Sequence, residues 1–287
     1  MSQTPLFAVM LMVLSMVSYQ ISASFAKQLF NVLDPFTVTT LRLCFASIII
    51  IVMLRSWQVL KLWSLLKWRD LLCYSLALCL MNVLFYISLS ELPQGIAVGL
   101  EFIGPLGLAL LSIQRARDFI WVGCAILGII LMVPWGEAEQ NFSIFGAVCA
   151  LSAGLCWAFY IYFGQRVVHQ NIGMHALSIA IALSAISLLP ISLYRDSAAL
   201  LDLQHWPKAL AIAVLATAIP YALDLQALKR LNKLSYGTLS SLSPALAALT
   251  GLLLLGEQIG LWQWLALALI MLASIGVTLR STHSATA

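Results

Sequence analysis

The sequence predicts an all-α membrane protein with ten transmembrane helices, arranged as a 5+5 inverted-topology repeat with both termini in the cytoplasm. Three observations lead to this prediction. The chain of 287 residues is 62% hydrophobic and only 9% charged, whereas a soluble domain carries about 25% charged residues. Ten apolar runs approach the length that crosses a bilayer, roughly 17–25 residues. The first and second halves of the chain also show a weak internal similarity.

The ten runs follow one another with short connections, so few residues are expected outside the bilayer. The fifth run is short and is closed by Pro134. The expected spans are 6–26, 35–54, 69–89, 94–113, 118–134, 144–165, 174–194, 207–228, 234–255 and 261–279.

Lysine and arginine predict the orientation of these spans, because cytoplasmic loops are enriched in both residues. Of the 15 in the chain, eleven fall on the side of the N-terminus if that end is cytoplasmic. The far side carries only Lys27, Arg195 and Lys208, and Arg42 lies inside the second span. Both termini are therefore expected in the cytoplasm.

The internal similarity relates two stretches that each contain a proline. "ELPQGIAVGLEFIGPLGLALL" resembles "RLNKLSYGTLSSLSPALAALT" when Pro105 is aligned with Pro244, a shift of 139 residues. Glu101 then lies opposite Ser240. The alternative is chance similarity between leucine-rich stretches, but the two prolines occupy the same point of the fourth span in each half. Residues 1–136 and 137–287 would each hold five spans, and an odd number of spans inverts the second half.

Three prolines are expected to interrupt the helical hydrogen bonding near the middle of their spans. Proline has no N–H, so Pro105, Pro220 and Pro244 each free the carbonyl four residues earlier. Inside a membrane such groups must be satisfied by protein or water. Two breaks at equivalent positions predict a cavity near the interface between the repeats.

Glu101 is the candidate that stands out, because its freed carbonyl and its carboxyl both lie within an apolar span. Intramembrane ionisable residues are costly, and by default they are functional. A buried carboxyl can hold a proton at neutral pH. Glu101 could therefore exchange a proton for a substrate ammonium.

Other polar and aromatic side chains fit the same cavity and suit a small zwitterion, which needs acceptors for its ammonium, donors for its carboxylate and aromatic walls. They are Gln20, Ser24 and Lys27 in the first span, Asn82 and Tyr86 in the third, Trp157 and Tyr160 in the sixth, Tyr221 and Asp224 in the eighth and Ser240 in the ninth.

Several of these residues have a structural alternative. Lys27 could extend its amine to the outer interface, and Trp157 and Tyr160 could pack in the core. For Asp224 a surface ion pair with Lys229 or Arg230 is the alternative. Arg42 is expected to reach the interface or to pair with Asp34, and Glu257 is expected to be a boundary residue of the ninth span.

Enzymatic and nucleotide-driven functions find no support in the sequence. It contains no HExxH, GxSxG or Walker motif, and no Cys/His spacing of a metal site. No cofactor is expected. The basic residues are scattered through short loops, which argues against a nucleic-acid partner. A passive channel stays open as an alternative, and proton-coupled flux would separate it from a transporter.

The chain resembles the drug/metabolite transporter superfamily of the EamA type, and within it the threonine/homoserine exporters of bacterial inner membranes. The similarity runs from about residue 6 to residue 280. It is carried by "ASFAKQLF", "TTLRL", "MNVLFYISLSELPQGIAVGLEFIGPL", "GLCWAFYIYFGQR" and "SPALAALTGLLLLGE". The most specific part is "GIAVGLEFIGPL".

This resemblance implies export of small hydrophilic amino acids across the inner membrane by proton antiport, with aromatic amino acids or amphipathic drugs as the alternative substrates. One chain holds both halves, so a monomer is sufficient and a dimer is possible. The family tends to have a glutamate where this chain has Ser243, and often one at Asp224. The missing carboxylate puts in doubt any mechanism that needs paired acids in both halves.

Overall fold

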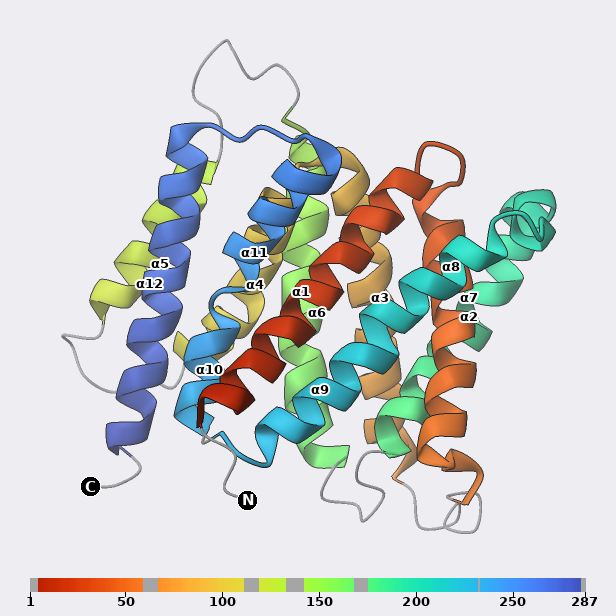
Figure 1. Cartoon of the computed structure of the whole chain (residues 1–287), viewed down its shortest axis with the longest axis horizontal. Helices are drawn as coiled ribbons and strands as arrows, with labels where there is room; N and C mark the ends of the chain where they lie inside the picture. Colours follow the sequence, from red (N-terminus) through yellow and green to blue (C-terminus); the bar gives the residue numbers. More distant parts are fainter. Residues whose placement is uncertain are drawn as a thin grey trace.

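The computed structural model describes residues 5–58, 67–110, 119–132, 142–167, 175–231 and 233–284, and all of its regular structure there is helical. The predicted all-α class is confirmed. Figure 1 shows a bundle in which α1 begins and α12 ends at the same end. An even number of crossings has this property, as the sequence predicts.

The helices follow the predicted spans closely, and two spans of the second half are divided into shorter pieces. The α-helices are α1 Pro5–Leu29, α2 Pro35–Leu54, α3 Trp68–Glu91, α4 Gln94–Leu110, α5 Phe119–Met132, α6 Ile144–Val167, α7 His175–Leu201, α8 Trp206–Ala213, α9 Ile219–Leu228, α10 Lys233–Ser240, α11 Ser243–Thr250 and α12 Leu261–Ser284. Two π-helical turns are η4 Val214–Ala218 and η5 Gly251–Leu255.

Eight of the helical segments are long and apolar enough to cross a membrane, where α8 to α9 and α10 to η5 each count as one. Two shorter apolar helices, α4 and α5, lie where the fourth and fifth spans are expected. Their predicted ends, together with Pro134, fall outside the described residues. The count of ten spans therefore stays a prediction.

Local sequence signals explain where α2 begins and ends. Asp34 caps the helix by accepting a hydrogen bond from the Phe36 N–H at 3.1 Å, and Pro35 occupies the first helical position, where a missing N–H costs nothing. Arg55 ends the helix in the left-handed conformation, with φ of 52°. These signals set the two ends of α2 and therefore the depth at which Arg42 lies in the bundle.

The bundle has two outer helix pairs with the remaining helices between them (Figure 1). α5 packs on α12 at one side, and α2 packs on α7 at the other. The packing contacts repeat under the predicted shift of 139 residues. α3 and α4 both pack on α6, just as α9 and α11 both pack on α1. α3 also contacts α7 as α8 contacts α2.

The three prolines have different outcomes. α4 remains one helix through Pro105, so the predicted interruption there is limited to the hydrogen bond that the proline cannot make. Pro244 lies at the start of α11, and two turn residues separate α11 from α10. Pro220 is the second residue after the η4 π-turn. The two halves therefore differ in backbone where their sequences align.

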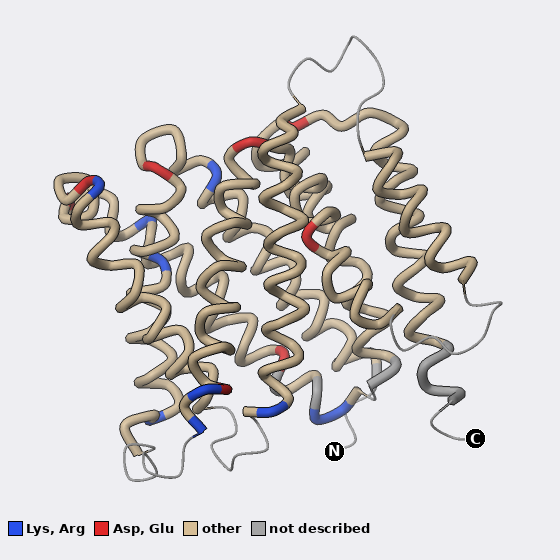
Figure 2. The backbone as a smooth tube through the Cα atoms, turned by 180° about the vertical axis from the view of Figure 1, so that it is seen from behind, with Lys and Arg blue, Asp and Glu red and all other residues tan. Residues whose placement is uncertain are grey.

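Charge and apolarity are distributed as a membrane protein requires. Figure 2 shows the charged residues gathered mainly at the two ends of the bundle, with few along the helices. Large apolar side chains are exposed along the helices; Leu14, Ile48, Leu155 and Leu253 are examples. Such an exterior is suited to lipid.

Candidate functional site

Glu101 is buried at the middle of the bundle. It lies on α4, and 5% of its surface is exposed. In the part of the chain that the structure describes, no hydrogen bond or ion pair reaches its carboxyl group. A buried carboxylate without a partner is costly, because desolvation is not repaid by contacts. The group therefore suits a role in which it takes up a proton or a cationic ligand.

The backbone beside Glu101 makes an unusually close helix crossing. A Cβ added to Gly104 of α4 would lie 1.8 Å from the carbonyl oxygen of Gly154 on α6, and one added to Gly154 would lie 2.4 Å from the carbonyl oxygen of Glu101. That carbonyl is the one Pro105 leaves without an N–H donor. Two glycines without side chains allow α6 to cover it. The crossing thus fixes the depth and rotation of Glu101.

Three residues of α2 and α3 form a second buried group, the inner cluster, which consists of Arg42, Asn82 and Tyr86. Their exposed fractions are 4%, 7% and 2%. The Arg42 guanidinium donates a hydrogen bond to the Asn82 side-chain oxygen and lies 4.9 Å from the centre of the Tyr86 ring. It also interacts electrostatically with Glu101. The inner cluster and Glu101 all come from the first half of the chain.

The expectation for Arg42 was therefore wrong. Its guanidinium is buried among helices and does not reach the interface. Its expected partner Asp34 instead forms an ion pair with Arg195 at 3.6 Å, on the exposed end of the bundle. In the sequence, Arg42 lies only two turns from the start of its helix. No local pattern in the sequence indicates that Asn82 and Tyr86 of α3 surround its guanidinium.

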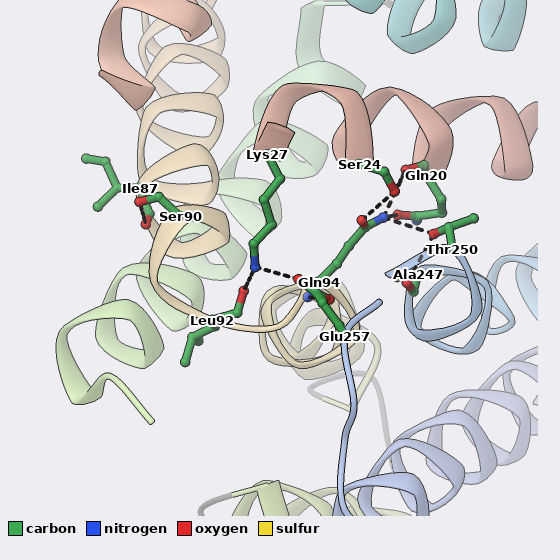
Figure 3. A network of polar contacts seen from close by, with 10 residues as sticks. All are labelled: Gln20, Ser24, Lys27, Ile87, Ser90, Leu92, Gln94, Ala247, Thr250 and Glu257. Atoms are coloured by element: carbon green, nitrogen blue, oxygen red, sulfur yellow. Dashed lines mark hydrogen bonds and ion pairs between the residues drawn. The ribbon is translucent and has the colours of Figure 1, made fainter. Parts of the chain in front are cut away.

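Figure 3 shows a polar network that joins α1 to α4 of the first half and to α11 of the second half, at the end of the bundle opposite the termini. Gln94, the first residue of α4, is at its centre. Its side-chain oxygen accepts a hydrogen bond from Ser24 at 2.7 Å, and its amide nitrogen donates to the Gln20 carbonyl at 2.9 Å and to Thr250 at 3.0 Å. The predicted residues Gln20 and Ser24 therefore meet in one network.

An ion pair extends this network. Lys27 lies 2.6 Å from Glu257, and it also donates a hydrogen bond to the Leu92 carbonyl (Figure 3). A carboxylate oxygen of Glu257 accepts a hydrogen bond from the Gln94 backbone N–H at 2.7 Å. Glu257 follows the end of η5 at Leu255 by two residues, where a boundary residue of the ninth span is expected. We name Gln20, Ser24, Lys27, Gln94, Thr250 and Glu257 the end network.

The end network ties α1 and the start of α4 to α11 and the segment before α12, so it closes this end of the bundle. We expect Glu257→Gln to weaken the closure, because it removes one charge of a pair whose side chains are only 22% and 15% exposed. The predicted result is a several-fold faster reaction of a cysteine placed at Ser24 with an impermeant maleimide, corresponding to about 1 kcal/mol. The measurement uses a background without native cysteines.

Arg195→Gln provides the matched control for this prediction. It breaks the exposed ion pair with Asp34, whose side chains are 56% and 41% exposed. The labelling rate should then stay unchanged. An unchanged rate in Glu257→Gln as well would contradict the role of the ion pair in closure.

The predicted aromatic walls mostly pack against other aromatic rings. The Trp157 ring meets Phe102 edge-on at 6.1 Å, and the Tyr160 ring stacks on Tyr74 at 4.7 Å. Phe102 is the residue after Glu101 in α4. Both residues are only partly buried. Packing is therefore what the structure shows for this pair.

The remaining candidates lie on the side of α1. Asp224 forms no ion pair with Lys229 or Arg230 among the described residues, so that expectation was wrong; its carboxyl interacts with Ser15 of α1. Tyr221 packs against the cluster that includes Tyr74 and Tyr160. The Ser240 hydroxyl bonds the Tyr236 carbonyl of its own helix at 2.9 Å.

Three serines of α1 satisfy carbonyl groups around the η4 turn. Ser22 donates to the Ile212 carbonyl at 3.0 Å, Ser18 to the Leu215 carbonyl at 2.8 Å and Ser15 to the Pro220 carbonyl at 3.3 Å. A π-turn followed by a proline disturbs the regular hydrogen bonding of the helix. This row of hydroxyl groups holds α1 against α8 and α9.

Sequence reasoning missed three participants. Gln94 and Thr250 are polar residues at helix ends, where polar residues are common, so neither stands out in the sequence. Their hydrogen-bond partners lie 70 to 163 residues away along the chain, so no local pattern relates them. Tyr19 interacts electrostatically with Glu101, Arg42 and Tyr86. It precedes Gln20 directly, but consecutive residues of a helix lie about 100° apart, so Tyr19 falls outside the predicted polar stripe.

Apolar helices around a buried carboxyl group, a buried guanidinium and a polar network at one end define a membrane transport protein. The family model of the EamA-like transporter family matches residues 144–279. The threonine/homoserine exporter RhtA of Salmonella typhimurium (strain LT2) is 42% identical, with 94% of this chain and 91% of that protein covered. RhtA of Escherichia coli K12 is 40% identical over the same shares. The chain belongs to the EamA-like transporter family.

A solved crystal structure supports the fold. It matches with a TM-score of 0.63 and 15% sequence identity, and the match covers 95% of this chain and 98% of that chain. An identity this low bears on the fold alone.

Proposed function

We propose that this protein exports small hydrophilic amino acids, such as threonine and homoserine, across the bacterial inner membrane in exchange for protons. The observation that carries the proposal is the unpaired, buried carboxyl group of Glu101, in a chain 42% identical to a threonine/homoserine exporter. An intramembrane acid of this kind can alternate between a proton and an ammonium group. The partners implied are the amino acid, the proton and the lipid bilayer.

The packing supports two inverted repeats, 1–136 and 137–287, as the frame for this activity. Helix contacts of the first half have counterparts in the second under one shift of 139 residues, and α1 begins at the end where α12 finishes. We propose that both termini are cytoplasmic, in agreement with the distribution of lysine and arginine. The end network would then close the periplasmic side. A monomer holds both halves and is sufficient.

Small substrates fit better than the alternative of aromatic amino acids or amphipathic drugs. The Trp157 and Tyr160 rings already have aromatic partners in Phe102 and Tyr74. The nearby buried groups are polar or charged and suit a short zwitterion.

Proteoliposomes with an acidic lumen test the proposal. Antiport predicts that labelled homoserine and threonine accumulate inside above their external concentration as protons leave, and that a protonophore abolishes the accumulation. Flux without accumulation would indicate a passive channel. Accumulation of phenylalanine or a cationic dye, with no homoserine flux, would select the alternative substrates.

A further inference from the structure

We propose that Arg42 binds the carboxylate of the transported substrate, so that the transporter selects free α-amino acids over amines, amino alcohols and esters. This inference rests on the proposed function and assigns the recognising group within it. The Arg42 guanidinium is buried, with 4% of the residue exposed.

The charge of Arg42 has no paired anion in the part of the chain that the structure describes. The ion pairs within 4.0 Å in that part of the chain join Lys27 to Glu257, Arg195 to Asp34 and His205 to Asp202, and none of them includes Arg42. Glu101 influences Arg42 electrostatically but is not paired with it. An uncompensated buried charge is strongly unfavourable. A ligand that brings a carboxylate removes this cost.

The inner cluster holds the guanidinium in place and leaves its Nε–H donor unused. The Asn82 side chain is itself fixed, because its amide nitrogen donates to the Leu78 carbonyl at 2.7 Å, and its oxygen accepts from one arm of Arg42. The guanidinium carbon lies over the ring of Tyr86, one turn further along α3. The Arg42 Nε is buried without a hydrogen-bond partner. Nε and a neighbouring N–H form the planar fork that matches a carboxylate.

Glu101 supplies the complementary charge. A zwitterion placed between the two residues has its carboxylate toward Arg42 and its ammonium toward Glu101, so both buried charges become compensated by one molecule. A substrate without a carboxylate compensates only Glu101. The absence of a direct ion pair between Arg42 and Glu101 is what leaves both groups available.

Competition against labelled homoserine in wild-type proteoliposomes tests this selection. Unlabelled homoserine should compete about 10- to 100-fold better than homoserinol, in which the carboxylate is reduced to an alcohol, because a hydrogen-bonded charge is lost. Equal competition by the two compounds would overturn the proposal.

Variants then assign the effect to Arg42. Arg42→Gln should raise the KM for homoserine about 10-fold or more and reduce the preference over homoserinol, and Arg42→Lys should fall between it and the wild type because it lacks the fork. Arg166→Gln is the matched control, since Arg166 is exposed and also lies over a tyrosine ring, that of Tyr162 at 4.4 Å. An unchanged KM and preference in folded Arg42→Gln would overturn the proposal. If that variant does not fold, the competition result decides.

Ligand-induced thermal stabilisation separates this inference from the proposed function. If wild type shows no homoserine or threonine flux, the purified protein is heated with each of the common amino acids and with the matching amino alcohols. Stabilisation by one amino acid, absent with its alcohol and lost in Arg42→Gln, would support Arg42 and reject the proposed substrate. Stabilisation by none of them would overturn the role of Arg42.

Discussion

Proteoliposomes carrying Glu101→Gln should lose the proton-driven accumulation of homoserine. The amide has nearly the shape of the carboxyl group but cannot exchange a proton, so coupling to the gradient disappears. We expect accumulation to fall by about 100-fold or to background, the scale of an essential charged contact. The variant should be at least as stable as the wild type, because an unpaired buried acid is removed.

Glu91→Gln is the control for this experiment, since Glu91 is exposed at the end of α3. Proteoliposomes that carry Glu91→Gln should accumulate homoserine to the same level as those that carry the wild type. Normal gradient-driven accumulation in Glu101→Gln would return Glu101 to a structural role and leave the coupling acid to be sought at Asp224.

Gly104→Ala should produce the largest loss of stability among single-methyl changes. The added Cβ would lie 1.8 Å from the Gly154 carbonyl oxygen, and the obstructing atoms are backbone, so a side-chain rotation cannot relieve the contact. α4 and α6 would have to separate at the depth of Glu101. We expect a destabilisation of about 3 kcal/mol, the upper part of the overpacking range, together with loss of transport.

Gly107→Ala is the matched variant, because it adds the same methyl group to the same helix less than one turn further along. A Cβ there meets nothing within 4 Å, and alanine favours the helix by about 1 kcal/mol. Thermal melting of the two purified variants in detergent gives the comparison. Equal melting temperatures would show that the close crossing does not limit stability.

The sequence predicts the membrane class and most helix positions because both depend on local composition. Apolar runs and lysine/arginine counts need no knowledge of partners. Gln20, Ser24 and Lys27 were likewise predicted to share one face, because their spacing on a helix is local, and all three lie in the end network.

Contacts between distant segments could not be predicted in this way. Arg42 and Asn82 lie 40 residues apart, and the distance to the helix start made an interfacial arginine the simpler interpretation. Pro105 and Pro244 occupy aligned positions in the two halves but have different outcomes. α4 packs against Gly154 through its own glycine and stays whole, whereas the segment at Pro244 divides into α10 and α11.

The η4 turn has a consequence for changes of chain length. A π-turn is in effect an α-helix with one inserted residue, and each residue of an α-helix advances the chain by about 100° around the axis. Deleting one residue within Val214–Ala218 would convert the turn to regular helix, because the wider turn is what absorbs the extra residue. Tyr221 and Asp224 would then keep their present faces, whereas the same deletion in a stretch of regular helix would rotate everything after it by about 100°. This helix therefore carries one residue that it can lose without changing the orientation of the residues that follow.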